Sequence, residues 1–194
     1  DKQINECMNK NLDAVNSDKW RNKYHIMAPI GWINDPNGLC EFNGEYHCYY
    51  QYSPLTPMGG LKFWGHAVSK DLANWEDKGV ALYPDINEDK DGVYSGSAFV
   101  KDDTIYFFYT GNVKHAGEHD YILTGREQNV ILVTSKDGIN FSEKKVLLRN
   151  TDFPADMSLH VRDPKVWEED GVYYMVLGAR TTDDKGCILL YKSN

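Results

Sequence analysis

Long apolar runs are missing from the sequence. No stretch of 18 or more apolar residues occurs, and residues 1–10 have neither a basic start nor an apolar core. Their absence argues against a membrane-spanning segment and against a secretory signal there, so we expect a cytoplasmic location. The four cysteines show no Cys-x-x-Cys pair and no metal-ligand spacing, which favours free thiols in a reducing compartment.

Positive charge is also scarce. The 21 lysines and arginines face 29 aspartates and glutamates, for a net charge of -8. Nucleic acids and anionic membranes would be repelled at long range, so we expect neither as a partner. The sequence has no H-E-x-x-H motif, no EF-hand loop and no clustered set of histidines, and we predict no metal and no cofactor. The class of partner that remains open is a small neutral or anionic ligand bound in a locally shaped pocket.

Aromatic and hydrophobic residues are plentiful, at 13% and 41% of the 194 residues, which is enough for the core of one domain. Residues 1–24 carry apolar side chains at near-helical spacing and predict a short amphipathic helix as a lead-in. These side chains are Ile4, Met8, Leu12 and Val15. Over residues 25–194, runs of Tyr, Phe and Val alternate with Asp, Gly and Asn clusters, which predicts a β domain.

The β region repeats itself. "NDPNGLCEFNGEYHCYYQ" from Asn34, "SGSAFVKDDTIYFFYTG" from Ser95 and "RDPKVWEEDGVYYMVLG" from Arg162 start 61 and 67 residues apart, and the stretches around Ser69 and Ser135 match each other 66 apart. A unit of this length with about four strands has the size of a long propeller blade. Because propellers close with about four to eight blades, we expect a truncated chain that holds about the first three.

Two of the repeats begin with Asp-Pro, at Asp35 and Asp163. Proline disfavours helical geometry in the residue before it, so we expect both aspartates in extended backbone, directed toward one central pocket. The alternative is that each aspartate only caps its own turn. Two Asp-Pro copies at matching places in the repeat favour a shared functional site over two separate turns. Arg162 can keep its neighbour Asp163 ionised.

Paired carboxylates among aromatic residues are typical of glycosidic bond cleavage. A sugar pocket needs aromatic platforms and polar edges, although each aromatic taken singly is more often a core residue. The candidates by position are Asn34, Gln51, Phe63, Trp64, Tyr94 and Ser95.

Taken in order, "WINDPNG", "YYQY", "KFWGHAVSKDLANWE", "YSGSA", "FFYTGN" and "RDPKVW" resemble the β-fructofuranosidases of glycoside hydrolase family 32, the invertase family. The resemblance extends over nearly the whole chain from Tyr24 onward. Within the family, it points to the bacterial sucrose-6-phosphate hydrolases.

The resemblance implies a five-bladed β-propeller that hydrolyses terminal β-D-fructofuranosyl linkages in sucrose 6-phosphate or sucrose. It identifies Asp35 with the family's nucleophile and Asp163 with the acid that stabilises the transition state. Family members retain configuration, for which two carboxyl groups roughly 5–5.5 Å apart are expected. The fructose subsite would be lined by Asn34, Gln51, Trp64, Tyr94, Ser95 and Arg162.

One family feature is absent. The general acid/base is a glutamate in a Glu-Cys motif beyond the Arg-Asp-Pro motif, and no Glu-Cys pair follows Arg162. Glu168 and Glu169 stand at an expected turn and are interpreted as surface charges. The family's C-terminal β-sandwich is also missing, so we expect the 194-residue chain by itself to be inactive.

Two alternatives stay open: a non-catalytic fructoside-binding fragment, and an inverting pentosidase on a similar propeller. A phosphorylated substrate would also require a cation or a helix N-terminus near the glucose side of the site. Charge alone makes Lys62, His66, Lys114 and Arg126 candidates for that contact, against the alternative that each is an ordinary surface or core residue.

Overall fold

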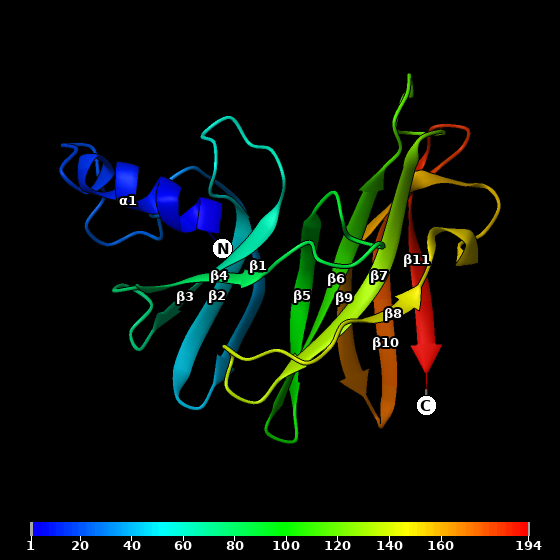
Figure 1. Ribbon diagram of the computed structural model, residues 1–194. Helices are drawn as coiled ribbons and strands as arrows, with labels where there is room; N and C mark the ends of the chain where they lie inside the picture. Colours follow the sequence, from blue (N-terminus) through cyan, green and yellow to red (C-terminus); the bar gives the residue numbers. More distant parts are fainter. Residues whose placement is uncertain (1, 194) are drawn as a thin grey trace.

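The computed structural model describes residues 2–193, which form one α-helix, a short 3-10 helix and eleven strands (Figure 1). The helices are α1 (Lys2–Asn16) and η1 (Asn150–Asp152). The strands are β1 (Trp32–Phe42), β2 (Glu45–Ser53), β3 (Phe63–Ser69), β4 (Glu76–Leu82), β5 (Val93–Lys101), β6 (Thr104–Lys114), β7 (Arg126–Ser135), β8 (Lys145–Leu148), β9 (Met157–Glu169), β10 (Val172–Thr181) and β11 (Gly186–Ser193).

The predicted short N-terminal helix is present and ends at Asn16, so it fills the first two thirds of the lead-in over residues 1–24. Polar side chains after it bond to nearby backbone: Ser17 Oγ donates to the Ala14 carbonyl, and Asp18 accepts from the Trp20 amide. Such local bonds compete with the helical ladder, which explains why the helix ends there. No helix among residues 2–193 has the length and apolar character to cross a bilayer.

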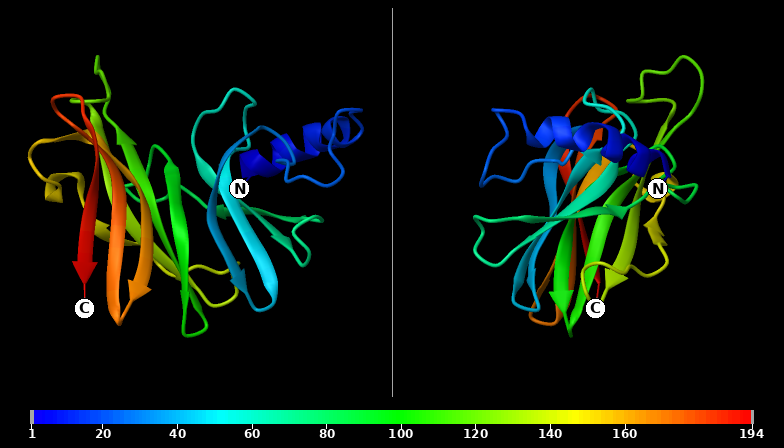
Figure 2. Two further views of the ribbon diagram at one scale, coloured as in Figure 1. Left: turned by 180° about the vertical axis from the view of Figure 1, so that it is seen from behind. Right: turned by 60° about the vertical axis from the view of Figure 1, so that its left-hand side comes forward.

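The strands form three antiparallel sheets that follow one another along the chain, which confirms the all-β prediction (Figure 2). Their orders are β1-β2-β3-β4, β5-β6-β7-β8 and β11-β10-β9. Each sheet contains one of the sequence repeats, as expected for blades joined in series. Closure by five blades in the complete fold remains a prediction.

The second repeated feature forms the same turn twice. After β3, Asp71 accepts bonds from Ser69 Oγ (3.1 Å) and the Asn74 amide (2.7 Å). After β7, Asp137 accepts the corresponding bonds from Ser135 and Asn140 at the same two distances. The sequence likeness between these stretches therefore reflects one local structure, in which an aspartate organises a turn.

The main core lies between the first two sheets. Tyr49, Trp64 and Phe107 are fully buried there, and the Tyr49 and Phe107 rings meet edge to face with centroids 4.8 Å apart. Gly38 makes this possible, because a Cβ at this left-handed position (φ 52) would lie 2.9 Å from the Tyr49 ring. Val130, Val161 and Leu177 form a smaller core between the second and third sheets.

The first strands of the three sheets lie side by side, since β5 packs against both β1 and β9. All three begin at the upper end of the molecule as drawn in Figures 1 and 2, where the loops over residues 54–62 and 115–125 project. Residues near the starts of β1, β5 and β9 are thereby brought together although they are far apart in the sequence.

Candidate active site

Each of these three strands departs from regular pairing at the predicted site residues. The irregularity in β1 contains Asn34 and Asp35, the one in β5 contains Tyr94 and Ser95, and the one in β9 contains Asp163. A β-bulge redirects side chains and is frequent beside active sites. The three bulges begin within two residues of one another in the repeat, so they bring the candidate residues to neighbouring places on adjacent strands.

Asp35 is bound directly to the neighbouring sheet. Ser95 Oγ donates a 2.7 Å hydrogen bond to Asp35 Oδ2, and the carboxylate is exposed to solvent. A second bond two residues along joins the same strands, from the Gly96 amide to Asn37 Oδ1 at 3.2 Å. Only glycine fits at position 96, because a Cβ there would lie 2.0 Å from the Phe108 carbonyl oxygen. The carboxylate is therefore held by one hydroxyl while it stays open to a ligand.

The prediction that Asp163 is extended was wrong. Its φ is 61°, in the left-handed region, which aspartate tolerates better than most residues do. Tertiary hydrogen bonds hold the bulge: Thr110 Oγ1 accepts from the Asp163 amide at 2.9 Å, and Ser97 Oγ donates to the Pro164 carbonyl at 2.7 Å. These bonds outweigh the local preference that proline imposes on the residue before it.

The Asp163 carboxyl is accessible to solvent yet partly surrounded by protein. This partial burial raises its pKa above the ordinary value, the Arg162 charge lowers it, and the Asp35 carboxylate raises it again. Asp35 and Asp163 thus lie within electrostatic reach of each other, as expected for two carboxylates in one pocket.

Arg162 is oriented by a residue that the sequence did not single out. Its Nη2 donates to His160 Nδ1 at 2.5 Å, and His160 Nε2 donates to the Tyr121 carbonyl at 3.0 Å. Burial and Arg162 lower the pKa of His160, which favours the neutral ring that this arrangement requires. Neither spacing nor motif marks His160, since the contact depends on how β9 packs against the loop over residues 115–125.

Gln51 and Trp64 are buried beside the site, with 4% and 0% of their surface exposed. Gln51 Nε2 donates to the Val93 carbonyl at 2.7 Å, and Trp64 Nε1 donates to the Tyr94 carbonyl at 3.0 Å. Both side chains therefore hold the backbone that leads into the β5 bulge. Their direct contact with a sugar stays a prediction. Phe63 belongs to the core, where its ring packs edge to face on Tyr83.

The four cation candidates separate into two groups. His66 is 2% exposed, stacks on Tyr49 with centroids 4.1 Å apart, and has its pKa lowered by burial to about 3. It is a neutral core residue and cannot attract an anion. Lys62, Lys114 and Arg126 instead lie at the upper end of the sheets, beside the candidate site.

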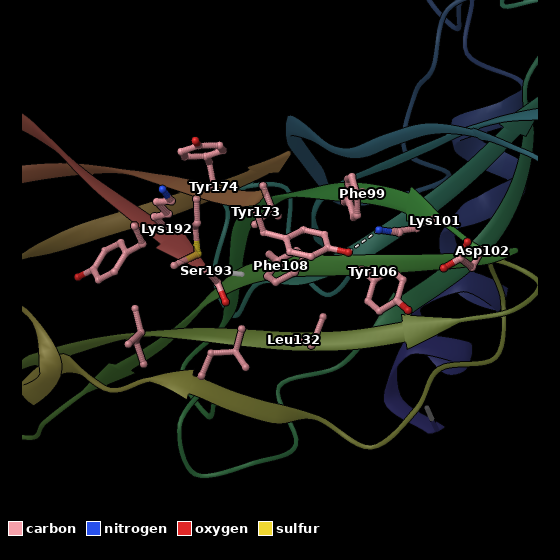
Figure 3. A pocket seen from close by; sticks show the side chains of 15 residues that line it. Phe99, Lys101, Asp102, Tyr106, Phe108, Leu132, Tyr173, Tyr174, Lys192 and Ser193 are labelled. Atoms are coloured by element: carbon pink, nitrogen blue, oxygen red, sulfur yellow. Dashed lines mark hydrogen bonds between the residues drawn. The ribbon is translucent and has the colours of Figure 1, made fainter. Parts of the chain in front are cut away.

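A groove of about 600 Å³ lies elsewhere, between the second and third sheets (Figure 3). Its walls are mainly apolar, and its polar rim is occupied by Lys101, which donates to Tyr173 and forms an ion pair with Glu168 at 2.6 Å. Sugar sites need several convergent polar groups, whereas most side chains that line this groove are aliphatic or aromatic. None of the predicted site residues lines it.

Comparison with known proteins decides the family. The family described as "Glycosyl hydrolases family 32 N-terminal domain" matches residues 25–194. The chain belongs to glycoside hydrolase family 32. A sucrose-6-phosphate hydrolase from Bacillus subtilis is 43% identical over 189 residues, which are 97% of this chain and 38% of that protein. A raffinose invertase from Escherichia coli is 42% identical, over 93% of this chain and 37% of its own length.

Solved structures of glycoside hydrolase family 32 agree. The sucrose-6-phosphate hydrolase from Lactobacillus gasseri superposes with a TM-score of 0.84 at 31% identity, over 97% of this chain and 37% of that one. A mutant of the Bombyx mori β-fructofuranosidase in complex with sucrose superposes with a TM-score of 0.82 at 32% identity, over 99% of this chain and 39% of that one. The chain thus spans less than two fifths of each of these relatives.

Proposed function

We propose that the full-length protein that carries these residues is a glycoside hydrolase that releases fructose from terminal β-D-fructofuranosyl linkages, with sucrose 6-phosphate or sucrose as substrate. The observation that carries this proposal is the placement of Asp35, held by Ser95, next to Asp163 and Arg162. The relatives named as sucrose-6-phosphate hydrolases and invertase support it, as does the sucrose complex of the silkworm enzyme.

In this proposal Asp35 is the nucleophile. The Ser95 hydroxyl fixes Oδ2 and thereby the plane of the carboxylate, so that Oδ1 is the oxygen that attacks the anomeric carbon. A covalent fructosyl-enzyme intermediate forms and water then hydrolyses it, so the configuration is retained. Holding the nucleophile in a reactive orientation lowers the entropic part of the barrier.

Asp163 accepts hydrogen bonds from fructose hydroxyls, and its negative charge stabilises the oxocarbenium-like transition state. This role requires the ionised form. Burial and the Asp35 carboxylate raise the pKa of Asp163 and so disfavour its ionised form. The Arg162 guanidinium lowers that pKa and favours the ionised form. Asn34 shares the β1 bulge with Asp35, and Tyr94 shares the β5 bulge with Ser95; both are proposed to contact the sugar.

The proton donor for the leaving group is assigned to no residue of this chain. Glu168 forms an ion pair with Lys101, and Glu169 is exposed near the hairpin end of β9. We therefore keep the prediction that the 194-residue chain alone is inactive, with a non-catalytic fructoside-binding fragment as the alternative. The cytoplasmic location also remains a prediction.

The test measures fructose release from sucrose 6-phosphate and from sucrose by the full-length protein. Asp35→Asn should abolish turnover with both substrates, because the amide is a far weaker nucleophile. Asp170→Asn, a change in an exposed turn residue, is the matched control and should keep activity. Normal turnover by Asp35→Asn would refute the nucleophile assignment. Inversion of configuration, followed by NMR of the product, would favour the pentosidase alternative.

A further inference from the structure

Three cationic side chains gather at the rim of the candidate active site. Lys62 immediately precedes β3, Lys114 ends β6 and Arg126 begins β7. Lys114 and Arg126 are direct partners in the β6–β7 register, and both approach the Tyr121 ring, at 5.3 Å and 5.9 Å from its centroid. Like charges directly opposite each other in a sheet are unfavourable, so this pair costs stability unless an anion accompanies it.

Burial and neighbouring charges act on two of these cations. Burial and then the Lys114 charge lower the pKa of Lys62, and burial together with the Arg162 charge lowers the pKa of Arg126, which a neighbouring tyrosine partly offsets. Within residues 2–193, none of the three cluster cations forms an ion pair with a carboxylate. In a chain of net charge -8, such a concentration of unpaired positive charge needs a reason.

The acidic side chains nearby are committed to other contacts. Asp91 accepts from the Lys114 backbone amide at 2.7 Å, and Asp120 accepts from three amides of its own loop. Glu127 contacts His115 at 2.9 Å. Arg126 retains unused donors: its Nε is buried without a protein partner in the described residues, and its Nη1 only approaches His160 at 3.4 Å.

The cluster is continuous with the proposed catalytic residues. The Lys62 carbonyl accepts from the Val93 amide at 2.9 Å, and a Cβ on Gly92 would lie 2.8 Å from the Tyr94 ring and 3.2 Å from Lys62 Cβ. Tyr94 shares the β5 bulge with Ser95, the hydroxyl that holds Asp35. A fructosyl unit held between Asp35 and Asp163 would leave the rest of its substrate to extend past this rim.

We propose that Lys62, Lys114 and Arg126 bind a phosphate monoester on the leaving-group half of the substrate. The inference rests on the proposed function and names its substrate class. Lys62 Nζ donates to the Gly60 carbonyl at 2.7 Å and lies 4.3 Å from the centroid of the Trp32 ring, so it would turn toward the ligand on binding. A tetrahedral dianion suits two ammonium groups and a guanidinium from separate elements, because charge-assisted bonds to phosphate are strong and an arginine can make two at once. Binding would also relieve the repulsion between Lys114 and Arg126.

The kinetic test uses Arg126→Gln and Lys114→Gln in the full-length protein. Each should lower kcat/KM for sucrose 6-phosphate by about tenfold or more, and at least fivefold more than it lowers kcat/KM for sucrose. Lys70→Gln removes an exposed charge after β3 and should change neither value by more than about twofold. Equal losses on both substrates would overturn the phosphate site and leave the proposed function intact.

A binding test separates the two proposals. Inorganic phosphate and glucose 6-phosphate are titrated into the protein and followed calorimetrically. Wild type and Lys70→Gln should bind both, and Arg126→Gln should bind at least about tenfold more weakly. Equal binding by wild type and Arg126→Gln would overturn the site. Phosphate binding that depends on Arg126, in a protein without fructosidase activity, would support the site and contradict the proposed function.

Discussion

Ser95 and Asp35 are joined by a 2.7 Å hydrogen bond that connects the first strands of two consecutive sheets. Each residue lies in a bulge of its strand, and the two bulges are one residue apart in the alignment of the sequence repeats. The contact therefore depends on two irregularities and on the packing of β1 against β5. It makes the orientation of the proposed nucleophile depend on the second repeat.

Ser95→Ala should lower kcat/KM for fructosides by about tenfold or more, because a hydrogen bond to a charged group is worth about 1.5–3 kcal/mol. Fructose release by the full-length protein measures it, and Ser17→Ala, at the exposed end of α1, is the control. Unchanged turnover in Ser95→Ala would mean that Asp35 does not need this hydroxyl for its orientation.

Thr110→Val should destabilise the fold and reduce activity together. The hydroxyl accepts from the Asp163 amide in a fully buried position, and its loss leaves that donor unpaired at a cost of about 1–3 kcal/mol. Urea unfolding and fructose release are measured in parallel. The exposed Thr151→Val serves as control. A stable variant with full activity would show that the β9 bulge forms without Thr110.

Arg162→Gln should move the acidic limb of the pH profile to higher pH. Arg162 lowers the pKa of Asp163, so its removal leaves burial and Asp35 to raise that pKa further, and a higher pH is then needed to ionise the carboxyl. The measurement is kcat/KM for sucrose against pH. A lower rate with an unmoved acidic limb would mean that Arg162 acts only by contact with the sugar.

Lys144→Met should be strongly destabilising. Lys144 forms 2.6 Å ion pairs with Asp85 and with the fully buried Asp89, which also accepts from Tyr109 Oη at 2.8 Å. Removing the cation leaves Asp89 buried without its counter-charge, at a cost of about 3–5 kcal/mol. Urea unfolding checks this value. Lys185→Met, which breaks an exposed pair with Asp183, should cost no more than about 1 kcal/mol.

Acid should weaken the two repeated turns. Hydrogen bonds from neighbouring amides and side chains lower the pKa of Asp71 and of Asp137 below its ordinary value. Their stabilisation is therefore complete above the unfolded pKa near 4 and is lost as pH falls toward the lower folded value. Asp137→Asn should flatten the decline of the urea midpoint below about pH 4. An unchanged decline would exclude Asp137 as a source of the acid sensitivity.

The sequence by itself determined the β texture, the repeat of sixty-odd residues and the two Asp-Pro positions, because strand periodicity and proline geometry are local properties. It also placed a short N-terminal helix within residues 1–24, which the structure shows over Lys2–Asn16. Only the tertiary structure decided that Asp163 is left-handed, that Gln51, Trp64 and His66 are buried, and that Lys114 lies opposite Arg126. Bulges, burial and the meeting of strands depend on contacts between residues far apart in the chain, which no local pattern encodes.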